Sequence, residues 1–261
     1  MRRRSALAAA TLSLGLTAPA ALAGPWAQAS SAGVCGLALA GEPQVELIHH
    51  RAELEQDGED HARVVMTAVV VNRAGPRQVP MGWVEVVFPR ELDGEAPPTP
   101  QWQEVELAVG SRVVPVTPAP LELTDGLMAC GDPPAPWSRR HARAFAWRAR
   151  VALPAQARTT VRLRARVPFL RDDWPGGDGG VLRSPRVLSV HLDPALRWAG
   201  PAMGGAAFTF RAATGHPPDR LAVDGPGGWE NGTWRWQADD LLLTQAPRFT
   251  VRRAVASDLR R

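Results

Sequence analysis

Arginine is the residue most suited to binding chemistry in this chain, because the sequence contains no Lys and all 30 of its basic residues are Arg. Arg148 and Arg150 alternate with apolar residues in one segment, and Arg162, Arg164 and Arg166 do so in the next. Side chains two positions apart on a strand point to the same side. Each segment therefore has a guanidinium face opposite an apolar face. Guanidinium groups bind carboxylates and phosphates, so these five arginines are a candidate anion-binding site.

Neighbouring strands must supply negative charge if these arginines face one another. A turn at 155–157 would make the two segments a hairpin, and the register that aligns their apolar faces places Arg150 opposite Arg162. Like charges in such positions destabilise a sheet. The acids expected alongside are Glu85, Glu104 and Glu106. An anionic ligand, such as a phosphate, a carboxylated glycan or a lipid headgroup, is one alternative, and a solvated Arg face is the other.

Two of the ten Trp residues, Trp234 and Trp236, share one face of a predicted strand. Exposed Trp rings form a stacking platform for sugar rings, whereas buried Trp rings contribute a large apolar area to a core. We expect the second arrangement, with Arg235 facing solvent between them. Glycan stacking by this pair remains the alternative.

The residue types that most catalytic and metal sites need are absent or wrongly spaced. Without Lys or Tyr, phosphate-binding P-loops, Schiff bases and phenolic nucleophiles are excluded. His49 and His50 are adjacent on a predicted strand and point to opposite faces. The acidic turn 56–61, with His61, and the acids at 172–178 match no calcium-binding motif. We predict no metal, no cofactor and no enzymatic activity, although a pair of carboxylates that meets only in space would still permit a hydrolase.

The first 23 residues have the pattern of a secretory signal peptide. Arginines 2–4 precede an apolar stretch from Ala6 to Leu16, and Ala21-Leu22-Ala23 forms a small-residue exit before Gly24. We predict a bacterial protein that is exported to the periplasm or secreted. The mature chain would contain 27 Arg and 26 acidic residues, a balance that gives no reason to expect a nucleic-acid partner. No later apolar run is long enough for a transmembrane segment.

Export gives the two cysteines an interpretation. An oxidising compartment pairs thiols, and Cys35 and Cys130 are the only two in the chain. We predict a disulfide between them, which would close a loop of about 95 residues and stabilise the fold by about 4–5 kcal/mol. Their spacing suits neither a redox motif nor a zinc site.

The segments that must position these residues are short and alternate between apolar and polar residues, with Pro, Gly and Asp clusters between them. This period of two predicts β-strands, and their spacing is typical of sandwiches and barrels. The expected strands are 45–54, 62–72, 82–88, 102–109, 112–116, 143–153, 158–167, 186–192, 207–212, 220–223, 233–237 and 249–252. Asn231-Gly232 predicts a tight hairpin turn, because both residues tolerate positive φ angles.

A Pro-rich stretch divides the predicted strands into two groups. Its Pro-Pro-Ala-Pro sequence cannot join a central strand, so we expect a boundary there and two antiparallel β-sandwich-like lobes after a cleaved signal peptide. The predicted segments are a signal peptide (1–23), an N-terminal β lobe (24–128), a linker (129–137), a C-terminal β lobe (138–253) and a basic tail (254–261).

The layout of three segments resembles a bacterial family of exported proteins known only as a domain of unknown function. One apolar strand ends in Asn72 (VVMTAVVVN), the next ends in Phe88-Pro89 (VEVVFP), and Trp147 is followed by Leu-Pro at 153–154. The resemblance implies an all-β exported protein and assigns no catalytic residues.

The function that the sequence favours is a non-catalytic binding or structural role at the cell envelope, carried out by an exported β-sandwich protein. Its partner would be an envelope protein or a polysaccharide. One alternative is a glycan- or polyanion-binding module that uses the arginines or the Trp pair. A second alternative is an envelope hydrolase.

Overall fold

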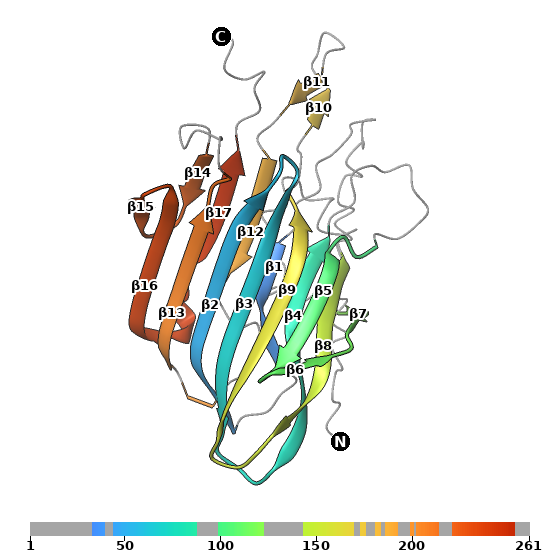
Figure 1. The fold of residues 1–261 in the computed structure, drawn as a ribbon, viewed down its shortest axis with the longest axis vertical. Helices are drawn as coiled ribbons and strands as arrows, with labels where there is room; N and C mark the ends of the chain where they lie inside the picture. Colours follow the sequence, from blue (N-terminus) through green and yellow to red (C-terminus); the bar gives the residue numbers. More distant parts are fainter. Residues whose placement is uncertain are drawn as a thin grey trace, which may run out of the picture.

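The strands of this protein form two large sheets (Figure 1). The computed structural model describes residues 33–39, 44–87, 99–122, 143–169, 173–175, 181–183, 186–192, 199–200, 202–213 and 221–253. The all-β prediction is confirmed, and the two sheets have a sandwich layout. Among the described residues, no helix is long and apolar enough to cross a membrane.

The two sheets, named A and B here, differ in size by one strand. Sheet A has the order β14 (Leu221–Asp224), β17 (Arg248–Arg253), β12 (Arg186–His191), β1 (Gly33–Leu39), β4 (Arg77–Val87), β8 (Arg143–Leu153) and β7 (Thr117–Leu121). Sheet B has the order β15 (Gly228–Glu230), β16 (Thr233–Leu242), β13 (Ala202–Arg211), β2 (Val45–Asp57), β3 (His61–Asn72), β9 (Arg158–Pro168), β5 (Gln103–Val109) and β6 (Arg112–Val114). A separate hairpin joins β10 (Asp173–Pro175) to β11 (Val181–Arg183).

Most neighbouring strands are antiparallel, but each sheet contains one parallel pair. In sheet A, β1 lies parallel to β12, and in sheet B, β2 lies parallel to β13. Both pairs join a strand from the first half of the chain to a strand from the second half. Each sheet draws strands from both predicted lobes, so the described strands form one sandwich around a shared core rather than two. The alternating pattern reveals which face of a strand is buried but not which strand it pairs with.

Proline accompanies two differences between the predicted and observed strands. β8 coincides with its predicted range, whereas β4 begins at Arg77, ahead of the predicted start, and includes Pro80. Pro80 directly precedes Met81, the first residue of β4 that pairs with β1, so among the described residues only β8 pairs with β4 there. The unpredicted strand β7 holds two prolines and lies at the edge of sheet A. The predicted linker 129–137 and the tail 254–261 lie outside the described residues.

The apolar faces of the two sheets pack against each other. Phe208 of sheet B stacks on Phe249 of sheet A with ring centroids 3.9 Å apart, and both rings are fully buried. Trp83 of sheet A meets His50 of sheet B in the same layer. The core therefore depends on aromatic contacts that cross between sheets, and every polar side chain of a central strand has to project outward or find a buried partner.

Replacing one of the stacked rings should test this packing. We expect Phe208→Ala to lower the free energy of unfolding by about 3–5 kcal/mol, because it removes a buried ring and leaves a cavity against Phe249. The control Leu242→Ala, at a side chain 42% exposed, should change it by less than about 0.5 kcal/mol. Urea unfolding at constant m-value measures both. Equal effects of the two substitutions would contradict the assigned core.

Candidate functional site

The five arginines that the sequence grouped together lie on different sheets. β8 pairs with β4 and β7 in sheet A, whereas β9 pairs with β3 and β5 in sheet B. The expected pairing of Arg150 with Arg162 is therefore wrong. The chain turns at 154–157 and crosses from one sheet to the other instead of forming a hairpin. Both arrangements bury the same apolar faces, so the alternation could not distinguish them.

The alternation within each strand is present in the structure. Arg148 and Arg150 are exposed while Trp147 and Val151 are buried, so these two arginines lie on the outer face of sheet A. Arg162 and Arg164 are exposed on the outer face of sheet B, and Arg166 is half-buried there. Of the five, only Arg164 and Arg166 join a larger charged cluster.

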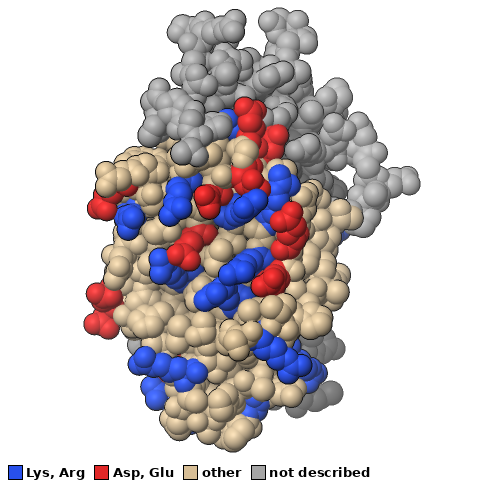
Figure 2. All heavy atoms as spheres, viewed as in Figure 1, with Lys and Arg blue, Asp and Glu red and all other residues tan. Residues whose placement is uncertain are grey.

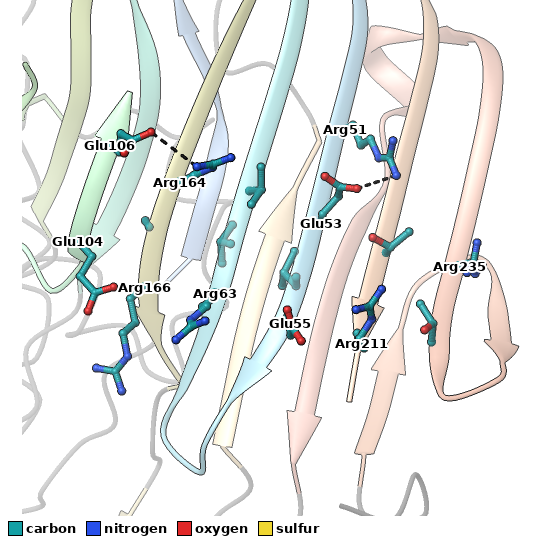
Figure 3. Close-up of a pocket in the computed structure, with 16 residues that line it drawn as sticks. Arg51, Glu53, Glu55, Arg63, Glu104, Glu106, Arg164, Arg166, Arg211 and Arg235 are labelled. Atoms are coloured by element: carbon teal, nitrogen blue, oxygen red, sulfur yellow. Dashed lines mark ion pairs between the residues drawn. The ribbon is translucent and has the colours of Figure 1, made fainter. Parts of the chain in front are cut away.

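That cluster, called the charged face below, covers part of the outer surface of sheet B (Figure 2). Its members are Arg51, Glu53, Glu55, Arg63, Glu104, Glu106, Arg164, Arg166, Arg211 and Arg235. They come from strands β2, β3, β5, β9, β13 and β16, which lie side by side (Figure 3). The sequence predicted part of it, namely Arg164, Arg166 and the acids Glu104 and Glu106. The contributions of β2 and β13 were missed, because only the pairing of distant strands brings them together.

Strand register arranges these side chains in rows across the sheet. One row runs through Arg211, Glu55, Arg63 and Arg166. The next row runs through Arg235, Thr209, Glu53, Val65, Arg164 and Glu106. The short side chains Thr209 and Val65 lie between longer ones, so the centre of the face is lower than its surroundings. The result is a hollow of about 750 Å³.

Ion pairs join most of the charged face. Arg51 Nη2 lies 2.7 Å from Glu53 Oε1, and Arg164 Nη1 lies 3.9 Å from Glu106 Oε1 (Figure 3). At one margin, Arg235 Nε lies 3.7 Å from Glu230 Oε2. All these side chains are substantially exposed, so each pair contributes at most about 1 kcal/mol. The ion pairs therefore add little to the stability of the fold, and their main effect is to place positive and negative groups side by side on this surface.

The β2–β3 turn closes one end of the charged face. Asp57 Oδ2 accepts a 2.8 Å hydrogen bond from Arg166 Nε and lies 3.5 Å from Arg63 Nε. The hydrogen bond from Arg166, together with the charge of Arg63, lowers the pKa of Asp57 below its ordinary value. In the described part of the chain, no three His, Cys, Asp or Glu side chains are arranged to hold a metal ion. The other acidic candidates, 172 and 178, lie outside the described residues.

A second hollow, of about 620 Å³, adjoins the first and shares Arg51, Thr209 and Arg235 with it. Its lining is less charged and includes Val69, Gly205 and Ala207. A Cβ at Gly205 would lie 2.7 Å from His49 Nδ1, so a larger residue there would displace the imidazole. The two hollows together form one trough along the strands. Its end near the β2–β3 turn is lined mainly by charged side chains, whereas its far end combines Val69, Gly205 and Ala207 with His49 and Asp239.

The Trp pair packs mainly against other rings. Trp234 meets Trp229 edge to face at 5.8 Å and donates a hydrogen bond to the Pro226 carbonyl oxygen, while Trp236 packs on Phe249 at 5.4 Å. Both rings are half-buried and Arg235 between them is exposed. Gly232 (φ 74°) and Asn231 (φ 48°) form the tight turn before Trp234. The rings are therefore largely occupied by protein contacts.

Burial strongly shifts the pKa values of two side chains inside the sandwich, His50 and Glu85. The imidazole of His50 is held between Trp83 Nε1, which donates to Nε2 at 3.3 Å, and the Leu192 carbonyl oxygen, 3.1 Å from Nδ1. An indole N–H can only donate, so Nδ1 carries the proton and the ring is neutral. Burial lowers the pKa of His50 to about 4. His49, the next residue, is exposed on the outer face, so the prediction of opposite orientations is confirmed.

Glu85 is fully buried rather than placed beside the arginines, where the sequence predicted a neutralising acid. Its Oε2 accepts a 2.8 Å hydrogen bond from Trp147 Nε1, and its Oε1 accepts bonds from the backbone N–H groups of Gln101 at 2.6 Å and Trp102 at 3.2 Å. These contacts tie β4 and β8 of sheet A to the segment that enters β5 of sheet B. Burial outweighs the hydrogen bonds and raises the pKa of Glu85 to about 7.

Glu85 should make stability depend on pH in a recognisable way. Its pKa is higher in the folded protein than in the unfolded chain, so the folded state holds the proton more tightly between about pH 4.5 and 7. The stabilisation is present below that window and is lost as the pH rises through it, by about 3 kcal/mol at most.

Chemical unfolding of the wild type and of Glu85→Gln across this pH range measures the effect. The difference between the two free energies of unfolding should fall as the pH rises, because the variant lacks the titrating group. Parallel curves would show that Glu85 does not titrate in this range.

Comparison with known proteins identifies a fold but no family. No family model matches the sequence, and no curated protein matches it either. Among solved structures, a protein from Legionella pneumophila described as a "putative nutrient binding protein" has a TM-score of 0.56 at 9% identity, covering 87% of this chain and 72% of that one. An M1 zinc metallopeptidase from Deinococcus radiodurans has a TM-score of 0.33 at 10% identity, covering 80% of this chain and 43% of the peptidase. At these identities the likeness concerns the fold alone.

Proposed function

We propose that this chain is an exported β-sandwich protein with a non-catalytic binding role at the cell envelope, and that the charged face is its binding surface. The supporting observation is the hollow of about 750 Å³ on the outer side of sheet B, which six Arg and four Glu side chains line. A solvated sheet face needs no such depression. Six adjacent strands contribute to it, so a partner would contact a rigid framework.

The balance of charge favours a protein partner over a polyanion. Glu53 and Glu55 lie in the middle of the face, between the arginines of β3 and β9 on one side and those of β13 and β16 on the other. A polyanion lying across these strands would meet both carboxylates, and like-charge contacts of that kind exclude a ligand. A protein surface with both signs of charge can pair with all three regions. The packing of the Trp pair on other rings also weighs against a sugar-stacking platform.

Export to the envelope rests on the sequence pattern at 1–23 and on the two cysteines. Cys35 belongs to β1, whereas Cys130 lies outside the described residues. We expect protein recovered from the envelope to begin at Gly24 and to take up no thiol label unless it is first reduced. Intact mass spectrometry with and without reduction measures both properties. The Cys35→Ser variant is the control, since its remaining cysteine should take up label without reduction. A chain that retains Met1, or two free thiols in the wild type, would contradict the proposal.

The binding surface can be located by photo-crosslinking in the native envelope. A photo-reactive phenylalanine derivative at Gln237, an exposed residue that lines the second hollow, should give a discrete adduct with a protein partner. The matched control is the same derivative at Ala152, which is exposed on β8 of sheet A.

Added salt tests whether the partner is held by charge, because the Debye length shrinks from about 10 Å at 0.1 M to about 3 Å at 1 M. The adduct from Gln237 should decrease with added salt, since opposite charges bring the partner to the charged face. Equal adduct patterns from the two positions would overturn the assignment of the binding surface.

A further inference from the structure

Two opposite charges near the centre of the charged face are left without an ion pair. Arg211 and Glu55 are opposite each other on the parallel strands β13 and β2, and both side chains are exposed (Figure 3). Within the described residues neither takes part in an ion pair, although Arg63, on the other side of Glu55, is held by Asp57. Their Cα atoms lie about 4.8 Å apart, the usual strand spacing. Among the described residues, the face therefore has an unpaired guanidinium directly beside an unpaired carboxylate, and Glu104, which is also in no ion pair, lies across the sheet on β5.

The trough extends well beyond this free pair. From Arg211 to Gly205 on β13, and likewise from Glu55 to His49 on β2, there are six residues, or about 20 Å of extended strand. The far part of the trough has Val69, Gly205 and Ala207 in its lining. A single small zwitterion would occupy only the charged end of this length.

We propose that the trough binds an extended segment of the partner protein, about six residues long, in which a basic side chain and an acidic side chain are followed by a small apolar residue. This inference rests on the proposed function, because it names the ligand of the same surface. The basic group pairs with Glu55 and the acidic group with Arg211. The apolar residue lies against Val69 and Ala207, the apolar side chains in the lining of the second hollow, which has fewer charged residues than the first.

Charge complementarity is the reason for requiring both signs in the ligand. A purely acidic segment would leave Glu55 without a partner and would approach Glu53 as well, and a purely basic segment would leave Arg211 without one. Charged groups two residues apart on an extended chain point to the same side, about 7 Å from each other. Long Arg and Glu side chains can span the difference between that spacing and the distance between neighbouring strands.

Four blocked hexapeptides that differ only at two positions test this inference. The parent carries Glu, Lys and Val at its first, third and fifth positions, with Ala elsewhere, and the other three replace Glu, Lys or both by Gln. Fluorescence anisotropy at low salt with the full mature protein measures the affinities. We expect the parent to bind about tenfold more tightly than either singly charged peptide, the gain typical of one charge-assisted hydrogen bond.

Variants of the protein assign each gain to one residue. Glu55→Gln should lower affinity for the parent about tenfold, to that of the peptide without Lys, and should leave that second peptide unaffected. Arg211→Gln should lower affinity for the parent to that of the peptide without Glu, and should leave the affinity for that peptide unchanged. Both side chains are exposed, so the fold should persist, and the far-ultraviolet circular dichroism spectrum checks it. Arg150→Gln, at an exposed arginine of sheet A, is the matched control and should change no affinity.

The outcomes separate this inference from the proposed function. Equal binding of all four peptides, no binding of any, or strongest binding by the acidic peptide overturns the mixed-charge ligand. If adducts at Gln237 persist in those cases, the proposed binding surface stands without this ligand. If they are absent as well, both proposals are wrong. If the peptide with Lys still binds the Glu55→Gln variant more tightly than the peptide without Lys, Glu55 is not the group that accepts the basic side chain.

Discussion

The packing of two apolar sheet faces against each other is the constraint on which the rest of this structure depends. Each long strand alternates, so one set of side chains enters the core and the other set must project outward. Because the interior is filled by apolar side chains, the arginines and most acids of the central strands have no place except the two outer faces. The charged face is thus a direct consequence of how sheet B buries Val64, Leu163 and Phe208.

The crossing between the two sheets after β8 requires its own buried polar contacts. Asn72 ends β3 fully buried, and its side-chain N–H group donates to the carbonyl oxygens of Gly75 at 2.9 Å and Leu153 at 3.2 Å. The backbone carbonyl oxygen of Asn72 accepts a hydrogen bond from the backbone N–H of Gln156 at 2.8 Å. The amide side chain thus gives a polar partner to the Leu153 carbonyl oxygen in a buried position. This is a physical reason for an Asn at the end of the apolar run of β3, beside the place where the chain crosses between the sheets after β8.

Much of the fold could be predicted from alternation, and the part that could not concerns pairing. The range of β8 and the outward orientation of Arg164 follow from local sequence, because local sequence determines which face of a strand is apolar. The partners of β8 and β9 do not follow, since a hairpin and a crossing between sheets bury the same residues. Glu85 was misplaced for a related reason. It shares parity with Trp83, which signalled burial, but the N–H donors that compensate it come from distant segments.

The charge pattern of the outer face of sheet B can be understood from the composition. A chain with only Arg for positive charge places guanidinium groups on strands β3, β9, β13 and β16, and neighbouring like charges would oppose the pairing of those strands. Carboxylates of β2 and β5 flank the arginines of β3 and β9, and Asp57 contacts both Arg63 and Arg166, so the face has bands of both signs of charge rather than a single basic surface. Such bands stabilise a sheet only weakly, because exposed pairs are well solvated. They do determine which ligands the face can accept, since each band repels one sign of charge and attracts the other. The ligand proposed above therefore carries both signs of charge, which a uniformly charged polymer does not.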